Sequence, residues 1–325
     1  MIAPTLPPAL KVALDAKLHG LSRSDTAARA AVISKTYRDG GGSGTIRTEA
    51  DALAYALARM PATYAAVVAC LNALSDVRPE FAPQSLLDIG AGPGTASFAV
   101  AEAFPSLRAF ALLDRNSALR ALALALAHDA ARLSELTYTS GEARSALAQA
   151  DAGDLVIASY VIGELGEAER DELVAVAWGK TNDTLVIVEP GTPAGYARII
   201  AARAQLLALG AHVAAPCPHD SACPLTPPDW CHFAQRLARS RAHKEIKGAE
   251  LPFEDEKFSY VIVTRAPVPG RPARVLAHPL VGKVEVAAKL CTSDGVIAAK
   301  VPRRDKSAYA QARRWRWGDG VMEES

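Results

Sequence analysis

Apolar and polar positions from residue 85 onward form a repeating pattern of short apolar runs and longer helical stretches. The apolar runs, each predicted to be a buried strand, lie at residues 85–89, 107–113, 155–160, 184–188, 212–215 and 258–264. The helical stretches between them lie at residues 95–103, 117–133, 167–178 and 193–209. Because strands alternate with helices, the pattern predicts an α/β fold with a parallel, doubly wound sheet.

The two ends of the chain depart from this alternation. Residues 9–75 are rich in Ala and Leu and are predicted to be mostly helical, with the glycine-rich stretch 37–44 as a linker. After the last strand, short β-like runs and a basic helical tail are predicted at residues 274–277, 283–290, 295–301 and 305–317. Three parts are expected. They are a helical N-terminal region at residues 1–80, a Rossmann domain at 81–265 with a Cys-rich insert at 214–250, and a basic β-rich module with a helical tail at 266–325.

Composition and charge narrow the class of protein. The chain has 325 residues, of which 50% are hydrophobic, enough to bury a sizeable core. The net charge of +1 hides an asymmetry, because residues 266–325 hold eleven Lys and Arg against six Asp and Glu. A basic module on a mildly acidic body favours an acidic partner, with nucleic acid first.

The sequence predicts a cytoplasmic location without a membrane partner. No uninterrupted apolar run reaches the roughly 18 residues that span a bilayer, and the start of the chain lacks the charged and apolar regions of a secretory signal. Five cysteines, an odd number, fit a reducing compartment better than a disulfide framework.

A glycine-rich turn follows the first predicted strand, in the run LLDIGAGPGT at residues 86–95. Glycines allow the close backbone approach that a ligand at a helix N-terminus requires. A dinucleotide fingerprint needs G-x-G-x-x-G, but here the third glycine falls one residue early. The pattern G-x-G-x-G, with Asp88 two residues before it, resembles the first motif of class I S-adenosylmethionine (SAM) methyltransferases.

This resemblance implies a set of cofactor-binding residues. Gly90, Gly92 and Gly94 would hold the methionine half of SAM. Asp114 ends the second predicted strand, where an acid commonly accepts hydrogen bonds from both ribose hydroxyls. The remaining candidates for cofactor contact are Asp88 and Ser159.

No catalytic motif is evident at the fourth strand, which faces the substrate in such enzymes. Residues 159–162 read SYVI, where an amino-methylating enzyme would usually have Asn/Asp-Pro-Pro-Tyr/Phe. A cytosine-C5 methyltransferase would need a cysteine nucleophile there, and none lies on the fourth or fifth strand. Glu164 and Glu189 follow strand ends and are weak candidates for orienting a substrate, with contact to cofactor or loop backbone as the alternative. Methyl transfer itself therefore stays open.

Three of the five cysteines, Cys217, Cys223 and Cys231, are gathered in one proline-rich stretch. Their wide spacing is a poor match to the C-x2–4-C knuckles of structural zinc sites. It fits a four-iron cluster better, because such clusters are held by cysteine thiolates at varied spacings. Zinc stays open through the histidines at 219 and 232, as do buried free cysteines. Cys291, some sixty residues later, is a candidate fourth thiol, and Cys70 is expected in the core.

Several runs carry a resemblance to one family. They are YALARMPATY at 55–64, EPGTP at 189–193, AAPCPHD at 214–220, DWCHF at 229–233 and FEDEKFSY at 253–260. They resemble the methyltransferase-like assembly factors of the mitochondrial small ribosomal subunit and their bacterial relatives. The resemblance extends from about residue 30 to the tail.

The family resemblance implies a SAM-type Rossmann domain, a four-iron, four-sulfur (4Fe-4S) cluster and association with small-subunit ribosomal RNA. The cluster ligands would be Cys217, Cys223, Cys231 and Cys291, so the cluster would join the C-terminal module to the Rossmann body. The function is then that of an active RNA methyltransferase or of a catalytically silent assembly factor, with methylation of a non-RNA substrate as a third class. A monomer is expected off the ribosome.

The basic tail supplies candidate RNA contacts. The cations are Lys300, Arg303, Arg304, Lys306, Arg313, Arg314 and Arg316, with Tyr309, Trp315 and Trp317 among or beside them. Cations neutralise phosphates, and aromatic rings stack on unpaired bases. A second basic set follows the cysteine stretch, at Arg236, Arg239, Arg241, Lys244 and Lys247.

Overall fold

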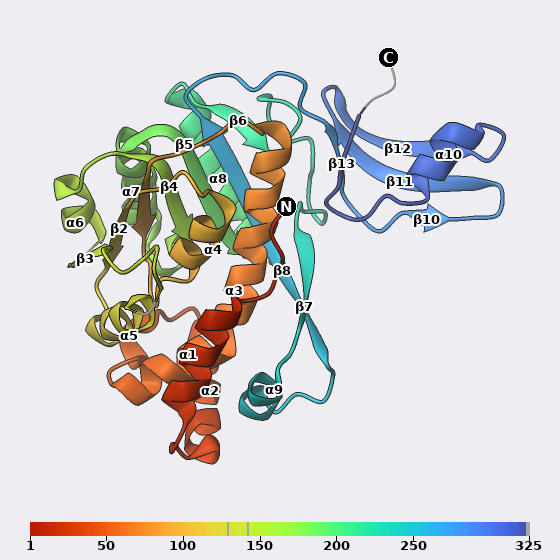
Figure 1. The fold of residues 1–325 in the computed structure, drawn as a ribbon. Coiled ribbons are helices and arrows are strands. Elements are labelled where there is room, and N and C mark those ends of the chain that lie inside the picture. The colour runs from red at the N-terminus through yellow and green to blue at the C-terminus, as the bar shows by residue number, and fades with distance from the viewer. Residues whose placement is uncertain (129, 142, 323–325) are drawn as a thin grey trace.

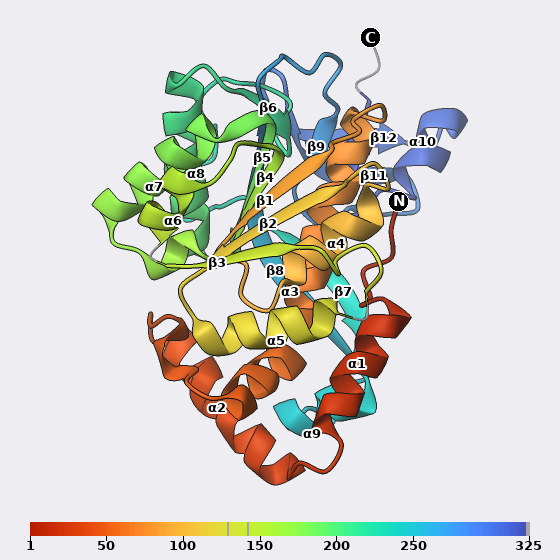
Figure 2. The ribbon, with the colours of Figure 1, turned by 60° about the vertical axis from the view of Figure 1, so that its left-hand side comes forward.

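The computed structural model describes residues 1–128, 130–141 and 143–322, and within these ranges the chain forms an eight-stranded and a five-stranded sheet. The strands of the larger sheet are β1 (Ser85–Ile89), β2 (Ala109–Asp114), β3 (Thr137–Ser140), β4 (Gly153–Ser159), β5 (Thr181–Pro190), β6 (His212–Ala215), β7 (Phe233–Ala238) and β8 (Phe253–Thr264). Their order is β3-β2-β1-β4-β5-β8-β6, with β7 paired to β8 (Figures 1 and 2).

The pairing of these strands identifies the fold. The neighbours from β3 to β5 are parallel, whereas β8 runs antiparallel to both β5 and β6. This order with one reversed strand is that of class I SAM methyltransferases. The predicted α/β Rossmann fold, with the Cys-rich insert between the last two strands of the sheet, is confirmed.

Helices cover both faces of the sheet because successive strand residues point to opposite sides. They are α4 (Thr95–Ala103), α5 (Ser117–Ala127), α6 (Ala143–Gln149), α7 (Glu167–Gly179) and α8 (Pro193–Ala208). Leu86 and Ile157 belong to one core, with α4 and α5, while Leu87 and Val156 belong to the other, with α7 and α8. The carboxyl ends of β1, β2 and β4 are thereby left open for a ligand.

The N-terminal helices share a core with one face of the sheet. They are α1 (Pro8–Leu18), α2 (Arg23–Arg38) and α3 (Glu49–Val77). α3 is one continuous helix that passes through Pro61. Its length and composition alone would allow it to cross a membrane, although it contains no uninterrupted apolar run of that length. In the fold most of its apolar residues are buried against the body, which accounts for its composition.

The hairpin of β7 and β8 extends out of the main sheet. Residues 233–238 pair with residues 253–258, of which only Phe258 also pairs with β5. The helix α9 (Arg241–Lys247) at its tip packs against α2 and α3. Figures 1 and 2 both show α1, α2 and α9 gathered at the end of the molecule away from the second sheet.

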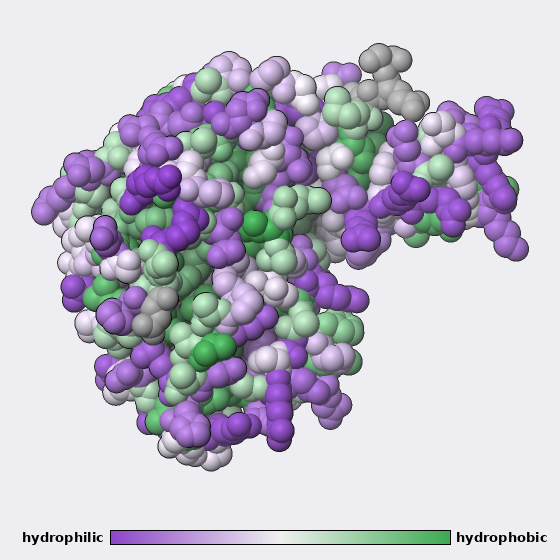
Figure 3. Space-filling model, in the orientation of Figure 1, coloured by the Kyte–Doolittle hydropathy of each residue, from purple (hydrophilic) through white to green (hydrophobic). Residues whose placement is uncertain are grey.

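The second sheet forms the C-terminal module. Its elements are β9 (Ala273–Val275), β10 (Leu280–Val281), β11 (Glu285–Thr292), β12 (Gly295–Pro302), the helix α10 (Lys306–Ala312) and β13 (Gly320–Val321). The described pairings between these strands are antiparallel, and a small core of Ala273, Val275 and Leu290 holds them together. The module projects from the body, and its visible surface is largely hydrophilic (Figure 3).

Candidate functional site

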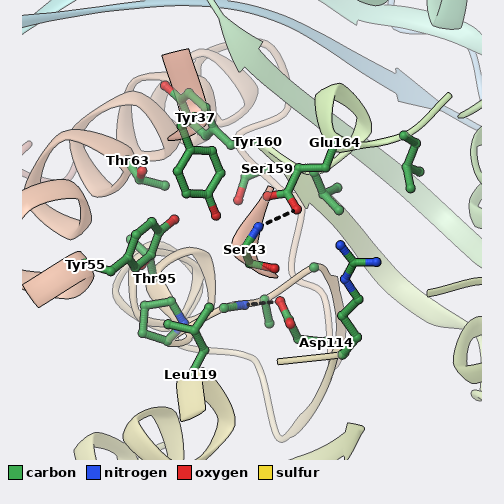
Figure 4. Close-up of a pocket in the computed structure, with 17 residues that line it drawn as sticks. Tyr37, Ser43, Tyr55, Thr63, Thr95, Asp114, Leu119, Ser159, Tyr160 and Glu164 are labelled. Atoms are coloured by element: carbon green, nitrogen blue, oxygen red, sulfur yellow. Dashed lines mark hydrogen bonds between the residues drawn. The ribbon is translucent and has the colours of Figure 1, made fainter. Parts of the chain in front are cut away.

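One pocket lies at the carboxyl ends of β1, β2 and β4, beside the glycine-rich turn (Figure 4). Four predicted cofactor residues line it, namely Gly90, Gly92, Asp114 and Ser159. Gly90 and Gly92 have positive φ angles of 68° and 54°, which residues with a Cβ rarely adopt. A Cβ on Gly90 would lie 2.4 Å from Cγ2 of Val161, so the turn requires glycine here.

Asp114 sits at the end of β2 with both carboxylate oxygens anchored. Its Oδ2 accepts a hydrogen bond from the backbone N–H of Gly92 at 2.9 Å, and its Oδ1 accepts one from the backbone N–H of Asn116 at 2.7 Å. Burial raises the pKa of this carboxyl, and these backbone bonds oppose the rise. Each carboxylate oxygen has two lone pairs, so the group keeps capacity for ribose hydroxyls.

Two predicted cofactor residues, Asp88 and Gly94, lie behind the turn, outside the pocket lining. Asp88 is fully buried, and its Oδ2 accepts hydrogen bonds from the backbone and hydroxyl of Ser97 at 3.1 and 2.7 Å. Burial raises the pKa of Asp88 to about 7. Gly94, with φ 80°, precedes α4 and faces Leu112 and Phe98. Asp88 and Gly94 thus shape the start of α4.

The N-terminal region forms the opposite wall of the pocket, which the sequence analysis missed. Ser43, from the stretch predicted to be a linker, donates its backbone N–H to Glu164 Oε2 at 3.2 Å (Figure 4). The Asn116 amide donates to the carbonyl oxygens of Ser43 and Ile46 at 3.0 and 2.9 Å. Segment 43–46 is therefore fastened across the pocket by two elements of the Rossmann body. These long-range bonds leave no local signature in the sequence.

The two weak catalytic candidates are both engaged by other groups. Glu164 lines the pocket, and burial raises the pKa of its carboxyl, which accepts the Ser43 bond. Glu189 lies outside the lining, is fully buried and accepts a hydrogen bond from Arg198 Nε at 2.6 Å. Its pKa is also raised by burial.

Tyr160 directly follows β4 and has an unusual backbone conformation, with φ 58°. Its hydroxyl donates to Glu256 Oε1 at 3.0 Å, and Arg59 Nη2 donates to the same oxygen at 3.3 Å. Burial raises the pKa of Tyr160 well above its usual value, so the hydroxyl stays protonated. This network ties α3, β4 and β8 together beside the pocket.

The described lining of the pocket offers few groups for acid–base chemistry. It contains no histidine or cysteine, and its carboxylates are Asp114 and Glu164, both accepting backbone hydrogen bonds. Tyr37 and Tyr55 also line it, and burial raises the pKa of both, that of Tyr55 to about 12. The arrangement suits binding and shielding of a ligand more than abstraction of a proton.

A second pocket brings four cysteines together. It lies between α8, the proline-rich stretch and the module, and is lined by Cys217, Cys223, Cys231 and Cys291. The Tyr196 hydroxyl lies 3.2 Å from Cys223 Sγ, and His219 Nε2 lies 3.7 Å from Cys291 Sγ. Burial raises the pKa of the Cys217, Cys231 and Cys291 thiols, that of Cys291 to about 12. Cys70 lies apart from them, buried in α3.

The described side chains of the second pocket are not arranged to coordinate a single metal ion. In the part of the chain that the structure describes, no three His, Cys, Asp or Glu side chains form a group that could hold a metal ion. The predicted cluster ligands therefore share a pocket without converging on one point. Their chemistry still fits a metal, because soft thiols are the donors that iron–sulfur clusters and zinc prefer.

Aromatic rings join the proline-rich stretch to the module. Trp230 stacks on His232 with ring centroids 4.9 Å apart, and His232 meets Trp317 edge to face at 4.7 Å. Trp317 also contacts His278 at 5.3 Å. Trp317 therefore packs where the proline-rich stretch meets the module. Tyr309 donates its hydroxyl to Gly282 O, again within the module.

The two predicted basic sets differ in how their charges are used. In the terminal set, Lys300 Nζ lies 3.8 Å from Glu285 Oε1. The other six side chains are exposed and form no ion pair with a described residue: Arg303, Arg304, Lys306, Arg313, Arg314 and Arg316. In the second set most cations are paired, as Arg236–Asp255, Arg239–Glu254, Arg241–Glu245 and Lys247–Glu254. The second set thus mainly braces the β7–β8 hairpin and α9, and the terminal set stays available to a polyanion.

A family model described as mitochondrial small ribosomal subunit Rsm22 matches residues 49–322. The chain belongs to the Rsm22 family. The resemblance predicted from the sequence is thereby confirmed. The match starts at the first residue of α3, so α1, α2 and segment 43–46 lie outside it.

Individual relatives agree with the family match. The human ribosome assembly protein METTL17, mitochondrial, is 30% identical over 84% of this chain. A Schizosaccharomyces pombe Rsm22-cox11 tandem protein, mitochondrial, is 28% identical over 84% of this chain. The chain spans 62% of the human relative and 43% of the yeast relative, so both have further sequence.

Solved structures with a similar backbone include two methyltransferases. Magnesium protoporphyrin IX methyltransferase from Synechocystis, with bound SAM, is 15% identical, with a TM-score of 0.41 over 76% of this chain and 99% of its own. An O-methyltransferase family protein from Burkholderia thailandensis is 14% identical, with a TM-score of 0.42 over 67% and 60%. These likenesses are too weak to carry an argument, and the fold rests on its strand order.

The predicted cytoplasmic location is wrong by these comparisons, because the matched relatives are named as mitochondrial proteins. The prediction rested on the odd number of cysteines and on the lack of a secretory signal or an apolar span. A protein can be addressed to an organelle without either feature.

Proposed function

We propose that this Rsm22-family chain is a methyltransferase-like factor that binds RNA of the small ribosomal subunit during its assembly. One observation supports this most strongly: a single chain carries a glycine-turn pocket of methyltransferase type and a projecting module whose six terminal cations have no described carboxylate partners. The human relative is named as a ribosome assembly protein, in agreement with this proposal.

The first pocket is proposed to bind SAM, which supplies an activated methyl group when bound. Asp114 would accept the ribose hydroxyls, and the turn of Gly90 and Gly92 would let the backbone approach the methionine half. Segment 43–46 would exclude water from the other side. Titration calorimetry with SAM tests this assignment, and Asp114→Ala should weaken binding by about tenfold or more, for the loss of hydrogen bonds to a charged group. Unchanged affinity would count against the assignment.

The lining of the first pocket also bears on whether bound SAM transfers its methyl group. The lack of an unengaged base in the described lining favours a catalytically silent assembly factor over an active enzyme. Single-turnover transfer of labelled methyl from SAM to immature small-subunit RNA separates the two. Ribosome co-sedimentation without transfer would support the silent factor, and stoichiometric transfer would establish an RNA methyltransferase.

RNA binding is proposed to depend on the terminal cations. Each phosphate contact of a single strand contributes about 0.7 to the slope of log affinity against log salt. Arg313→Glu with Arg314→Glu should therefore weaken binding and flatten the slope. The matched control is Arg236→Glu with Arg241→Glu, the same change in net charge at two cations already paired with carboxylates. If both double variants lose the same RNA affinity, or if neither loses any, the result would favour a methyltransferase of a non-RNA substrate.

The four cysteines are proposed to hold a 4Fe-4S cluster that fastens the module to the body. The donor set supports this, with three thiols from the proline-rich stretch and one from β11 around one pocket. Metal and sulfide analysis of anaerobically purified protein is the test, and a colourless protein with stoichiometric zinc would replace the cluster by zinc.

The fastening role has its own test. Cys223→Ser should lower both the melting temperature and the RNA affinity, because the basic module would no longer be held. Cys70→Ala is the matched control, since Cys70 lies in α3 away from the pocket. If Cys223→Ser keeps wild-type stability and RNA affinity, the fastening role is refuted.

A further inference from the structure

The cysteine pocket also holds both of the buried cations of the described chain. Among the residues that the structure describes, Arg203 and Arg274 are the buried members of the Lys and Arg set, with 3% and 5% of their surface exposed. Both line the pocket of the four cysteines. Arg203 comes from α8 in the Rossmann body and Arg274 from β9 in the module, so each side of the junction contributes one.

Neither guanidinium has a carboxylate partner within the described ranges. Arg203 Nη2 donates to the carbonyl oxygens of His219 and Ser221, each at 2.8 Å, and its Nε has no partner. Arg274 donates from Nε to Pro216 O at 3.1 Å and from Nη1 to Gly318 O at 2.9 Å. Carbonyl dipoles satisfy hydrogen bonds but supply no net negative charge.

Two buried glutamates in this fold, by contrast, each have a cation beside them. Glu189 is paired with Arg198, and Glu256 is paired with Arg59. A buried charge that is left without a counter-charge is strongly destabilising. Two such cations facing one pocket therefore point to an anionic occupant between them.

Neutral thiols do not provide this counter-charge, but metal-bound thiolates do. Cysteine binds a metal or a cluster as the thiolate. Four thiolates carry more negative charge than a zinc ion or a four-iron core carries positive charge, so the centre as a whole is an anion. We propose that Arg203 and Arg274 are the counter-cations of a thiolate-bound metal centre, one supplied by each of the two parts that the centre joins. This inference rests on the proposed metal site.

The test compares charge removal with charge retention. Arg203→Gln and Arg274→Gln remove the cation and keep a donor, Arg203→Lys and Arg274→Lys keep the cation, and Arg271→Gln is the matched control. Arg271 donates to Val213 O in β6 at 2.6 Å and is already paired with Asp220 of the proline-rich stretch. Each protein is reconstituted anaerobically with ferrous iron and sulfide, and in parallel with zinc, and its affinity is measured by competition with a chelator.

The glutamine variants should bind the centre about 10-fold to 100-fold more weakly, the range for residues that support metal ligands. The lysine variants should lose clearly less affinity, and Arg271→Gln should match the wild type. Glutamine variants that bind as tightly as the wild type would overturn the inference. If the wild type takes up neither iron with sulfide nor zinc, the proposed metal site itself fails.

Melting temperatures of loaded and metal-free protein separate this role from simple packing. Counter-cations should lower the stability of the metal-free form, because nothing there balances them. The glutamine variants should therefore melt earlier than the wild type when loaded, but no earlier when metal-free. Glutamine variants that lose stability equally in both forms, or do not fold without metal, would overturn the inference in favour of a packing role.

Discussion

Replacing Asn116 with serine should loosen the segment that closes the first pocket while leaving the neighbouring helix intact. The side chain of Asn116 forms two sets of hydrogen bonds. Its Oδ1 accepts a hydrogen bond from the Leu119 N–H at 3.0 Å and so caps α5. Its amide nitrogen donates to Ser43 O and Ile46 O. Serine caps helices about as well as asparagine. The shorter serine side chain cannot reach segment 43–46. Asn116→Ser therefore removes the two hydrogen bonds to this segment and keeps the cap of α5.

The size of the effect follows from the two bonds lost. A hydrogen bond contributes a net stabilisation of about 1 kcal/mol, so two contribute about 2 kcal/mol. Because 1.4 kcal/mol is a factor of ten, the equilibrium constant for opening of segment 43–46 should rise by about 30-fold. The dissociation constant of SAM should rise by no more than this factor, since only the closed fraction changes.

Hydrogen exchange with mass spectrometry measures this local opening directly, in peptides that cover residues 40–48. Added SAM should restore part of the lost protection, because the segment lies across the pocket. The matched control is Asn72→Ser, since the Asn72 amide donates to Ile2 O at 3.0 Å and fastens the chain start instead. Unchanged exchange at 40–48 in Asn116→Ser, or equal loss in Asn72→Ser, would show that these bonds do not hold the segment closed.

Three further changes probe the fold around the site. Burial lowers the pKa of His243 from 6.5 to about 4, so the unfolded chain binds a proton there that the folded chain does not. The free energy of unfolding should therefore fall by about 3 kcal/mol in total as the pH drops through this window. For His243→Leu, the free energy of unfolding measured in urea should depend on pH less steeply by this amount. An identical pH dependence in both proteins would contradict the assignment. Glu256→Gln leaves Arg59 without its carboxylate and should cost about 2 kcal/mol in the free energy of unfolding, below the full cost of a buried pair because the Arg59 side chain is 30% exposed; a loss under about 0.5 kcal/mol would show that solvent compensates. Gly195→Ala would place a Cβ 1.9 Å from the carbonyl oxygen that ends β5 and should cost about 2 kcal/mol, whereas Gly179→Ala meets no atom within 4 Å and should be nearly neutral; equal melting temperatures for the two variants would argue against the clash.

Strands with a continuous apolar run could be predicted from the sequence, and those without one could not. β1 spans residues 85–89 as predicted, because its residues are nearly all buried. β3 was missed because only Tyr138 among its four residues is buried. β7 was missed because only Phe233 and Leu237 of its six residues are buried, so it has no continuous apolar run. It pairs only with the protruding part of β8. The helix predicted at 117–133 ends at residue 127.

The sequence by itself determined the Rossmann alternation, the glycine turn and the gathering of three cysteines in one stretch. Each of these depends on residues that are close along the chain, where backbone preferences and spacing act directly. The family, too, could be inferred from short runs such as DWCHF at 229–233.

Only the tertiary structure decided which distant residues meet. It brought Cys291 to the other three cysteines, laid Ser43 across the pocket of Asp114, and set Arg203 and Arg274 on opposite sides of one junction. It also paired most of the second basic set with carboxylates and left six of the terminal cations without described ion pairs. The physical reason is that the cost or gain of a buried charge depends on what the fold places beside it, and local sequence does not specify that neighbour.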